Sequence, residues 1–118
     1  MKMNIGIFQY EMQDESPLEK IDRLAAILNE KPQLDLVVCP ELFISGYGSF
    51  EKIQQYSETS DGKYANRISS LAIETNTEII YGYTEISDDR LFNSAQLFDS
   101  KGLSMANHHK KMLPPTAD

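Results

Sequence analysis

The sequence contains few cysteines, few basic residues and no long hydrophobic run, and each of these shortages excludes some classes of protein. With one cysteine, Cys39, in 118 residues, it can form no internal disulfide, which agrees with a reducing compartment. No stretch approaches the roughly 20 apolar residues that span a bilayer, and no signal-peptide pattern opens the chain. We therefore expect a cytoplasmic protein with no membrane partner.

Eleven lysines and arginines against eighteen aspartates and glutamates give a formal net charge of −7. This charge repels nucleic acid, so we expect no nucleic-acid partner. Hydrophobic residues make up 41% of the chain and charged residues 25%, which is typical of a folded soluble protein. At 118 residues the chain holds one domain at most.

Residues 3–10 are rich in β-forming side chains and predict a first strand, near the centre of a sheet. Ile5 and Ile7 would share one face of it. Phe8 and Tyr10 would share the other.

A loop at 11–15 precedes a helix whose start is marked by Ser16, Pro17 and Glu19. Ser16 and Glu19 have the spacing of a capping box, and proline is tolerated at the first helical position. The helix carries apolar residues at helical spacing, which predict one stripe against the sheet: Leu18, Ile21, Leu24, Ala25 and Leu28.

Residues 49–63 predict a loop or a short, poorly packed helix, and 64–75 predict a second helix that ends at Asn76 in a left-handed turn. Three antiparallel strands follow at 78–86, 91–98 and 103–109, with turns at Asp88–Asp89 and at 100–102. The order predicts an α/β layered domain, with a mixed sheet and two helices on one face.

A short apolar run ends abruptly at Pro40 and Glu41. Residues 36–38 lack polar alternation, which predicts a strand buried on both faces. Pro40 ends this strand and places Glu41 at its C-terminal mouth, where α/β proteins collect catalytic and binding groups. The residues alone leave two interpretations open: a catalytic carboxylate, or a merely solvated one.

A second candidate site is the run His108, His109, Lys110 and Lys111. A lysine there could stabilise an oxyanion or perturb a nearby acid, but the residues alone favour a solvated basic edge. Adjacent strand residues point to opposite faces, so we expect no metal site on the two histidines. We also expect no cofactor.

Taken together, these stretches resemble the nitrilase, or carbon-nitrogen hydrolase, superfamily. The resemblance covers essentially the whole chain in the correct order, and the YGYTE segment is most similar to the amidase-like branch. It implies part of an α-β-β-α sandwich. The matching segments are Pro40–Glu41 with Gly46 and Tyr47, YGYTE at 81–85, NSAQLFDSKG at 93–102 and HHKKML at 108–113.

The resemblance implies that Glu41 is the general base and that Lys110, rather than Lys111, is the catalytic lysine, because Leu113 then falls at the family's leucine. In the family a cysteine thiol attacks an amide, carbamoyl or nitrile carbon, and the lysine stabilises the oxyanion. Water guided by the glutamate then hydrolyses the thioester. The implied partners are a small-molecule amide or carbamoyl substrate and, for the full domain, further copies of the same protein.

The sequence departs from the family at the nucleophile, which lies well C-terminal of the lysine in the family and is absent here. We interpret Cys39 as a small buried apolar residue and not as a substitute. We therefore expect residues 1–118 to be the N-terminal part of a single hydrolase domain, truncated after the lysine motif. The alternatives are a non-catalytic remnant that pairs with a full-length homologue and, third, a binding domain for small carboxylates or amides.

Overall fold

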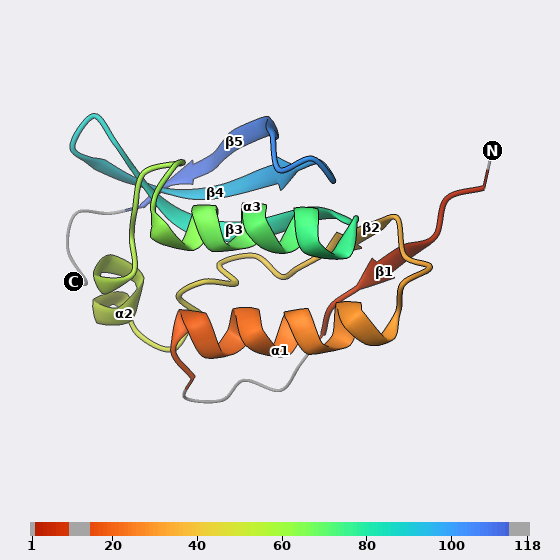
Figure 1. Ribbon diagram of the computed structural model, residues 1–118. Coiled ribbons are helices and arrows are strands. Elements are labelled where there is room, and N and C mark those ends of the chain that lie inside the picture. Colours follow the sequence, from red (N-terminus) through yellow and green to blue (C-terminus); the bar gives the residue numbers. More distant parts are fainter. Residues whose placement is uncertain (1, 10–14, 114–118) are drawn as a thin grey trace.

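The structure is a computed structural model that describes residues 2–9 and 15–113 (Figure 1). Five strands form one mixed sheet in the order β1-β2-β3-β4-β5, parallel from β1 to β3 and antiparallel from β3 to β5, which confirms the predicted α/β class. The elements are β1 (Ile5–Ile7), α1 (Pro17–Glu30), β2 (Leu36–Val38), α2 (Phe50–Gln55), α3 (Lys63–Thr75), β3 (Glu78–Ser87), β4 (Arg90–Phe98) and β5 (Ser104–Met112).

Three predicted features lie outside the described residues: Tyr10, the loop at 11–14 and the tail at 114–118. In the part of the chain that the structure describes, no helix is both long enough and apolar enough to cross a membrane.

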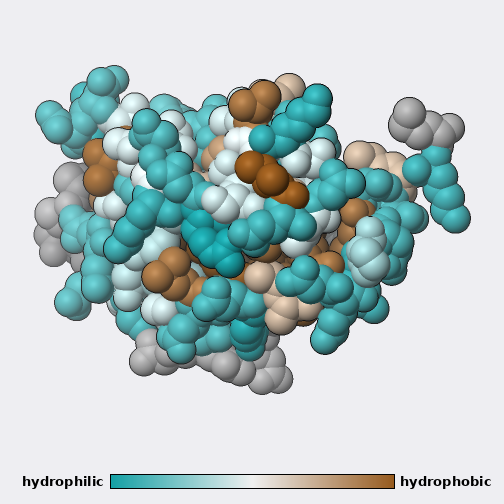
Figure 2. Space-filling view, in the orientation of Figure 1, coloured by the Kyte–Doolittle hydropathy of each residue, from teal (hydrophilic) through white to brown (hydrophobic). Residues whose placement is uncertain are grey.

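Helices α1 and α3 lie side by side over one face of the sheet, as predicted, and the short α2 lies at one end (Figure 1). Their outer surface is largely hydrophilic, with isolated hydrophobic spots (Figure 2). The space between these helices and the sheet is filled by the hydrophobic core. It includes Phe8, Ile21, Leu24, Leu28, Val37, Ile68, Leu71, Ile79, Tyr81, Tyr83 and Phe98.

The predicted helix ends are confirmed. The Ser16 hydroxyl accepts a hydrogen bond from the Glu19 N–H, and the Glu19 carboxylate accepts one from the Ser16 N–H, which completes the capping box. Helix α3 ends at Asn76 in the left-handed conformation, with φ of 52°. Asp88 and Asp89 also have positive φ and form the tight turn between β3 and β4.

The predicted stripe of α1 is wrong at one position. Leu18 is 48% exposed, whereas Pro17 and Lys20 are buried on the face that meets the sheet. One residue advances a helix by about 100°, so Leu18 turns away from the face that Pro17 and Ile21 occupy. A lysine therefore takes a place in the stripe that an apolar side chain would normally fill.

Two predictions about the strands are also wrong. β1 is an edge strand among the described residues, not a central one, and Ile5 and Ile7 are 57% and 71% exposed. In β2 only Val37 is buried, while Leu36 and Val38 are half-buried on the opposite face. The apolar pattern predicts cover on both faces, but the described part of the chain supplies helices for one face only.

The last strand is longer than predicted, since β5 continues to Met112. Its final residues run beside the first half of β4, where Lys111 pairs with Asn93. This extension carries the predicted lysine site into the sheet.

Gly82 of β3 lets the main chain that follows β2 lie directly against the sheet. A Cβ atom at Gly82 would lie 2.5 Å from the Leu42 nitrogen and 2.8 Å from the Pro40 oxygen. The Ile44 N–H also donates a 3.2 Å hydrogen bond to the Gly82 carbonyl. Gly82 therefore sets how closely the segment that carries Glu41 approaches β3.

We expect Gly82→Ala to lower the free energy of unfolding by about 1–3 kcal/mol, because the new methyl group meets main-chain atoms that cannot rotate away. Urea denaturation measures the change. Gly48→Ala is the matched control, since nothing lies within 4 Å of a Cβ there. Equal stabilities of the two variants would contradict this account of the contact.

Candidate active site

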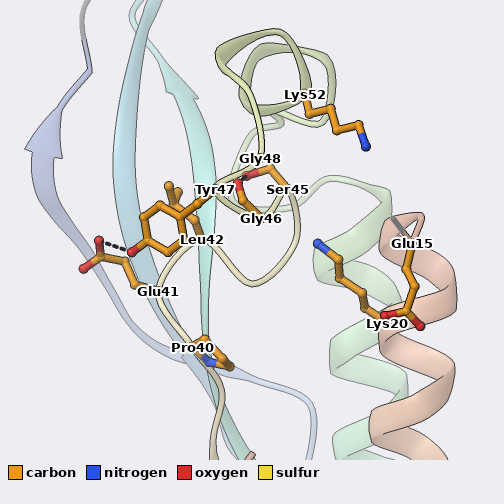
Figure 3. Close-up of a pocket in the computed structure, with 10 residues that line it drawn as sticks. All are labelled: Glu15, Lys20, Pro40, Glu41, Leu42, Ser45, Gly46, Tyr47, Gly48 and Lys52. Atoms are coloured by element: carbon orange, nitrogen blue, oxygen red, sulfur yellow. Dashed lines mark hydrogen bonds between the residues drawn. The ribbon is translucent and has the colours of Figure 1, made fainter. Parts of the chain in front are cut away.

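Glu41 is held by one partner that is distant in sequence and by one that is near. The Lys110 Nζ contacts the Glu41 Oε2 although 69 residues separate them in sequence. The Tyr47 hydroxyl donates a 2.5 Å hydrogen bond to the Glu41 Oε1 (Figure 3). Both carboxylate oxygens are thus engaged, while 37% of the Glu41 side chain stays exposed.

A β-bulge in β5 aims Lys110 at this carboxylate. Ser94 of β4 pairs with His109 and Asn93 pairs with Lys111, so Lys110 is the extra residue between them. Bulges bend a strand and redirect a side chain, and they are frequent beside active sites. The structure thus brings together Glu41 and Lys110, the two residues predicted from the sequence.

The residue before the bulge is anchored on the opposite, helix-covered side. The His109 Nε2 lies 3.0 Å from the Glu85 carboxylate, and its ring stacks on Phe92 with ring centres 4.2 Å apart. The Asn107 amide donates two further hydrogen bonds to Glu85, which is buried. Together with the contact between Lys110 and Glu41, these contacts fix β5 on both sides of the sheet.

The electrostatics keep Glu41 ionised. Hydrogen bonds from Lys110 and then from Tyr47 and Asn93 lower the pKa of Glu41 to about 2, although burial opposes them. Burial and the neighbouring Glu41 raise the pKa of the Tyr47 phenol to about 12. At neutral pH Glu41 is therefore a carboxylate and Tyr47 a protonated phenol.

Two polar side chains beside Glu41 have unused hydrogen-bonding atoms. Asn93 and Thr84 are buried and stand opposite each other on β4 and β3. The Asn93 Oδ1 and the Thr84 Oγ1 are buried and have no hydrogen-bond partner among the described residues. Buried polar atoms without a partner are uncommon in folded proteins, so these two mark the neighbourhood of Glu41 as unusual.

Cys39 lies apart from these groups in the hydrophobic core. It is 5% exposed, and burial raises the pKa of its thiol. The predicted role of Cys39 as a small buried apolar residue is confirmed. His108 and Lys111 are exposed, and the described residues hold no group of three or more side chains suited to a metal ion.

Sequence reasoning did not find that Tyr47 and Asn93 are hydrogen-bond partners of Glu41, or that Lys20 is buried. Tyr47 and Asn93 carry a weak signal, since each lies in a segment that matches the family. Lys20 carries none, because helix periodicity treats a lysine as part of the solvated face. A hollow of about 150 Å³ separates the 41–48 segment from α1 and α2, and Lys20 and Lys52 enter it from these two helices (Figure 3).

The sequence is similar to two proteins that carry the name hydrolase. It is 34% identical over 113 residues to the "Hydrolase in pqqF 5'region" of Pseudomonas protegens, an alignment that spans 94% of this chain and 40% of that protein. It is 33% identical over 110 residues to "Hydrolase C26A3.11" of Schizosaccharomyces pombe, spanning 90% of this chain and 34% of the relative. The chain thus spans about 40% or less of the length of these curated relatives.

Solved structures share the fold. The crystal structure of an N-terminal amidase superposes with a TM-score of 0.75 at 24% identity, over 92% of this chain and 28% of that one. A carbon-nitrogen hydrolase from Helicobacter pylori G27 gives a TM-score of 0.75 at 21% identity, over 96% of this chain and 41% of that one. A sequence model described as "Carbon-nitrogen hydrolase" matches residues 2–118, and the chain therefore belongs to the carbon-nitrogen hydrolase family.

Proposed function

We propose that this chain is the N-terminal part of a single carbon-nitrogen hydrolase domain that cleaves non-peptide C–N bonds of small amides. Glu41 acts as the general base, and Lys110 supplies positive charge to the oxyanion. The observation that carries the proposal is the contact between the Lys110 ammonium and the Glu41 carboxylate, made by residues 69 positions apart. The length of the relatives supports a nucleophile in the remainder of the domain.

In the first half of the proposed reaction, Glu41 takes the proton of a cysteine thiol as the sulfur attacks the amide carbon. The carbonyl oxygen gains a negative charge, which the Lys110 ammonium stabilises. The C–N bond then breaks, and the proton on Glu41 passes to the departing nitrogen. A thioester and ammonia or an amine result.

In the second half, Glu41 takes a proton from a water molecule that attacks the thioester carbon. The C–S bond breaks, the acid is released, and the proton returns to the cysteine sulfur. Lys110 stays protonated throughout. Glu41 is ionised at neutral pH, so it can accept a proton in both halves.

We favour an amide substrate over a nitrile for two reasons. Several of the matching structures and relatives carry the name amidase, and the YGYTE segment is most similar to that branch. The Asn93 Oδ1, buried and without a partner among the described residues, offers an acceptor for an N–H group beside Glu41. A nitrile has no N–H to donate.

Glu41 should titrate near pH 2 in the 118-residue chain, as measured by carbon NMR of its side-chain carboxyl. A lowered pKa means that the Glu41–Lys110 contact stabilises the fold fully above pH 4.5, the ordinary carboxyl pKa, and fades as the pH falls toward 2. Lys110→Met should move the midpoint up toward 4.5. Lys111→Met is the control and should leave it unchanged; a midpoint near 4.5 in the unmodified chain would refute the contact.

Activity is best tested in the protein expressed from its complete reading frame, with ammonia release from a short aliphatic amide as the readout. We expect Glu41→Gln and Lys110→Met each to lower kcat about 100-fold or more, because each removes a group that acts in the transition state. Lys111→Met and Cys39→Ala should keep kcat within a few-fold.

Two outcomes would overturn the proposal. One is turnover at the unmodified rate in Glu41→Gln or Lys110→Met. The other is amide hydrolysis by the 118-residue chain that disappears with Cys39→Ala, since Cys39 would then be the nucleophile.

A further inference from the structure

Lys20 is an unusual residue for its place in the fold. It lies in the buried stripe of α1, between Pro17 and Ile21, and is only 4% exposed. Burial lowers the pKa of its ammonium group, while Glu15 opposes this effect. Burying a charged amine is costly unless its N–H groups are hydrogen-bonded, so the contacts of Lys20 indicate what it stabilises.

Those contacts are two main-chain carbonyls of the segment that follows Glu41. The Lys20 Nζ lies 3.1 Å from the Phe43 oxygen and 3.2 Å from the Ile44 oxygen, both in buried surroundings. Figure 3 shows the Lys20 side chain extending from α1 toward this segment. Lys20 therefore ties the first helix to the turn at 42–47.

This turn has a demanding backbone. Leu42 adopts a φ of 51° and Gly46 a φ of 74°, both in the left-handed region. The Gly46 N–H closes the turn on the Leu42 carbonyl at 2.7 Å. A Cβ at Gly46 would lie 3.2 Å from the Lys20 Nζ, so the lysine packs tightly against the turn.

The turn connects Glu41 to Tyr47, whose side chains meet at the site. Glu41 precedes it and Tyr47 ends it, and the bond between their side chains links its two ends. A shift of the turn by one ångström would separate the phenol from the carboxylate, because hydrogen bonds weaken steeply with distance and angle. The position of the turn against α1 thus decides whether Tyr47 and Glu41 meet.

We propose that Lys20 is a positioning residue for Glu41: its ammonium group holds the turn at 42–47 so that the Tyr47 hydroxyl reaches the Glu41 carboxylate. The functional meaning of this inference rests on the proposed role of Glu41 as the base. The geometric claim does not, because it concerns two side chains whose ionisation can be measured without turnover.

The test compares Lys20→Met with Lys52→Met in the 118-residue chain. Methionine keeps much of the length of lysine but has no N–H donors. Lys52 enters the same hollow from α2, which makes it the matched control. Carbon NMR of labelled tyrosine and glutamate side chains follows the ionisation of Tyr47 and Glu41, and amide hydrogen exchange follows residues 42–47.

In Lys20→Met we expect the pKa of Tyr47 to fall from about 12 toward its ordinary value of 10 and that of Glu41 to rise from about 2. Amides of the turn should exchange about tenfold to a hundredfold faster. Lys52→Met should leave all three readouts unchanged. A folded Lys20→Met variant in which Tyr47 and Glu41 titrate as in the unmodified chain would overturn the proposal, even if its stability fell.

If Lys20→Met does not fold, a measurement on the unmodified chain still tests the proposal. The Nζ protons of Lys20 should exchange with solvent at least about tenfold more slowly than those of the exposed Lys111, because two of them are held in buried hydrogen bonds. Equal exchange rates would overturn the proposal. None of these readouts uses turnover, so the result is separate from the fate of the proposed hydrolase activity.

Discussion

The close approach of two main chains at Gly82 is the constraint on which the site depends. Without a side chain at Gly82, the segment after β2 lies directly on β3, and the Glu41 Cα sits 2.8 Å from where a Cβ would be. The carboxylate is then within reach of β5, although two strands, β3 and β4, lie between β2 and β5. A site built from residues far apart in sequence thus follows from one short distance between backbones.

The two faces of the sheet carry different kinds of side chain. On the face that α1 and α3 cover, apolar side chains such as Ile79 and Tyr81 form the core. On the other face, Gly82, Thr84 and Asn93 replace apolar residues, and Glu41 and Lys110 meet over them. The stability of the first face lets the second keep buried polar atoms without partners among the described residues, at a cost in free energy.

Sequence reasoning succeeded where the signal is local. The capping box at Ser16, the turn at Asp88 and the end of α3 at Asn76 were predicted, because neighbouring residues decide them. The pairing of Glu41 with Lys110 was predicted through the resemblance, since spacing alone favoured a solvated basic edge. The failures have a different origin.

The predictions that failed concern residues whose burial depends on distant parts of the chain. The apolar pattern of β1 and β2 predicts burial, but it does not say which element supplies the cover, so Ile7 is exposed among the described residues. Lys20 was missed because its burial depends on carbonyl groups more than twenty residues away. No periodicity within α1 reports the shape of a turn that packs against it.

The bulge at Lys110 has a consequence for how this segment tolerates change. His109 faces Glu85 on one side of the sheet, and Lys110 faces Glu41 on the other. Substitutions in β5 alter one contact at a time. Inserting or deleting one residue there would instead exchange the two sides and disrupt both polar clusters at once. The length of β5 is therefore more tightly constrained than the identity of most of its residues.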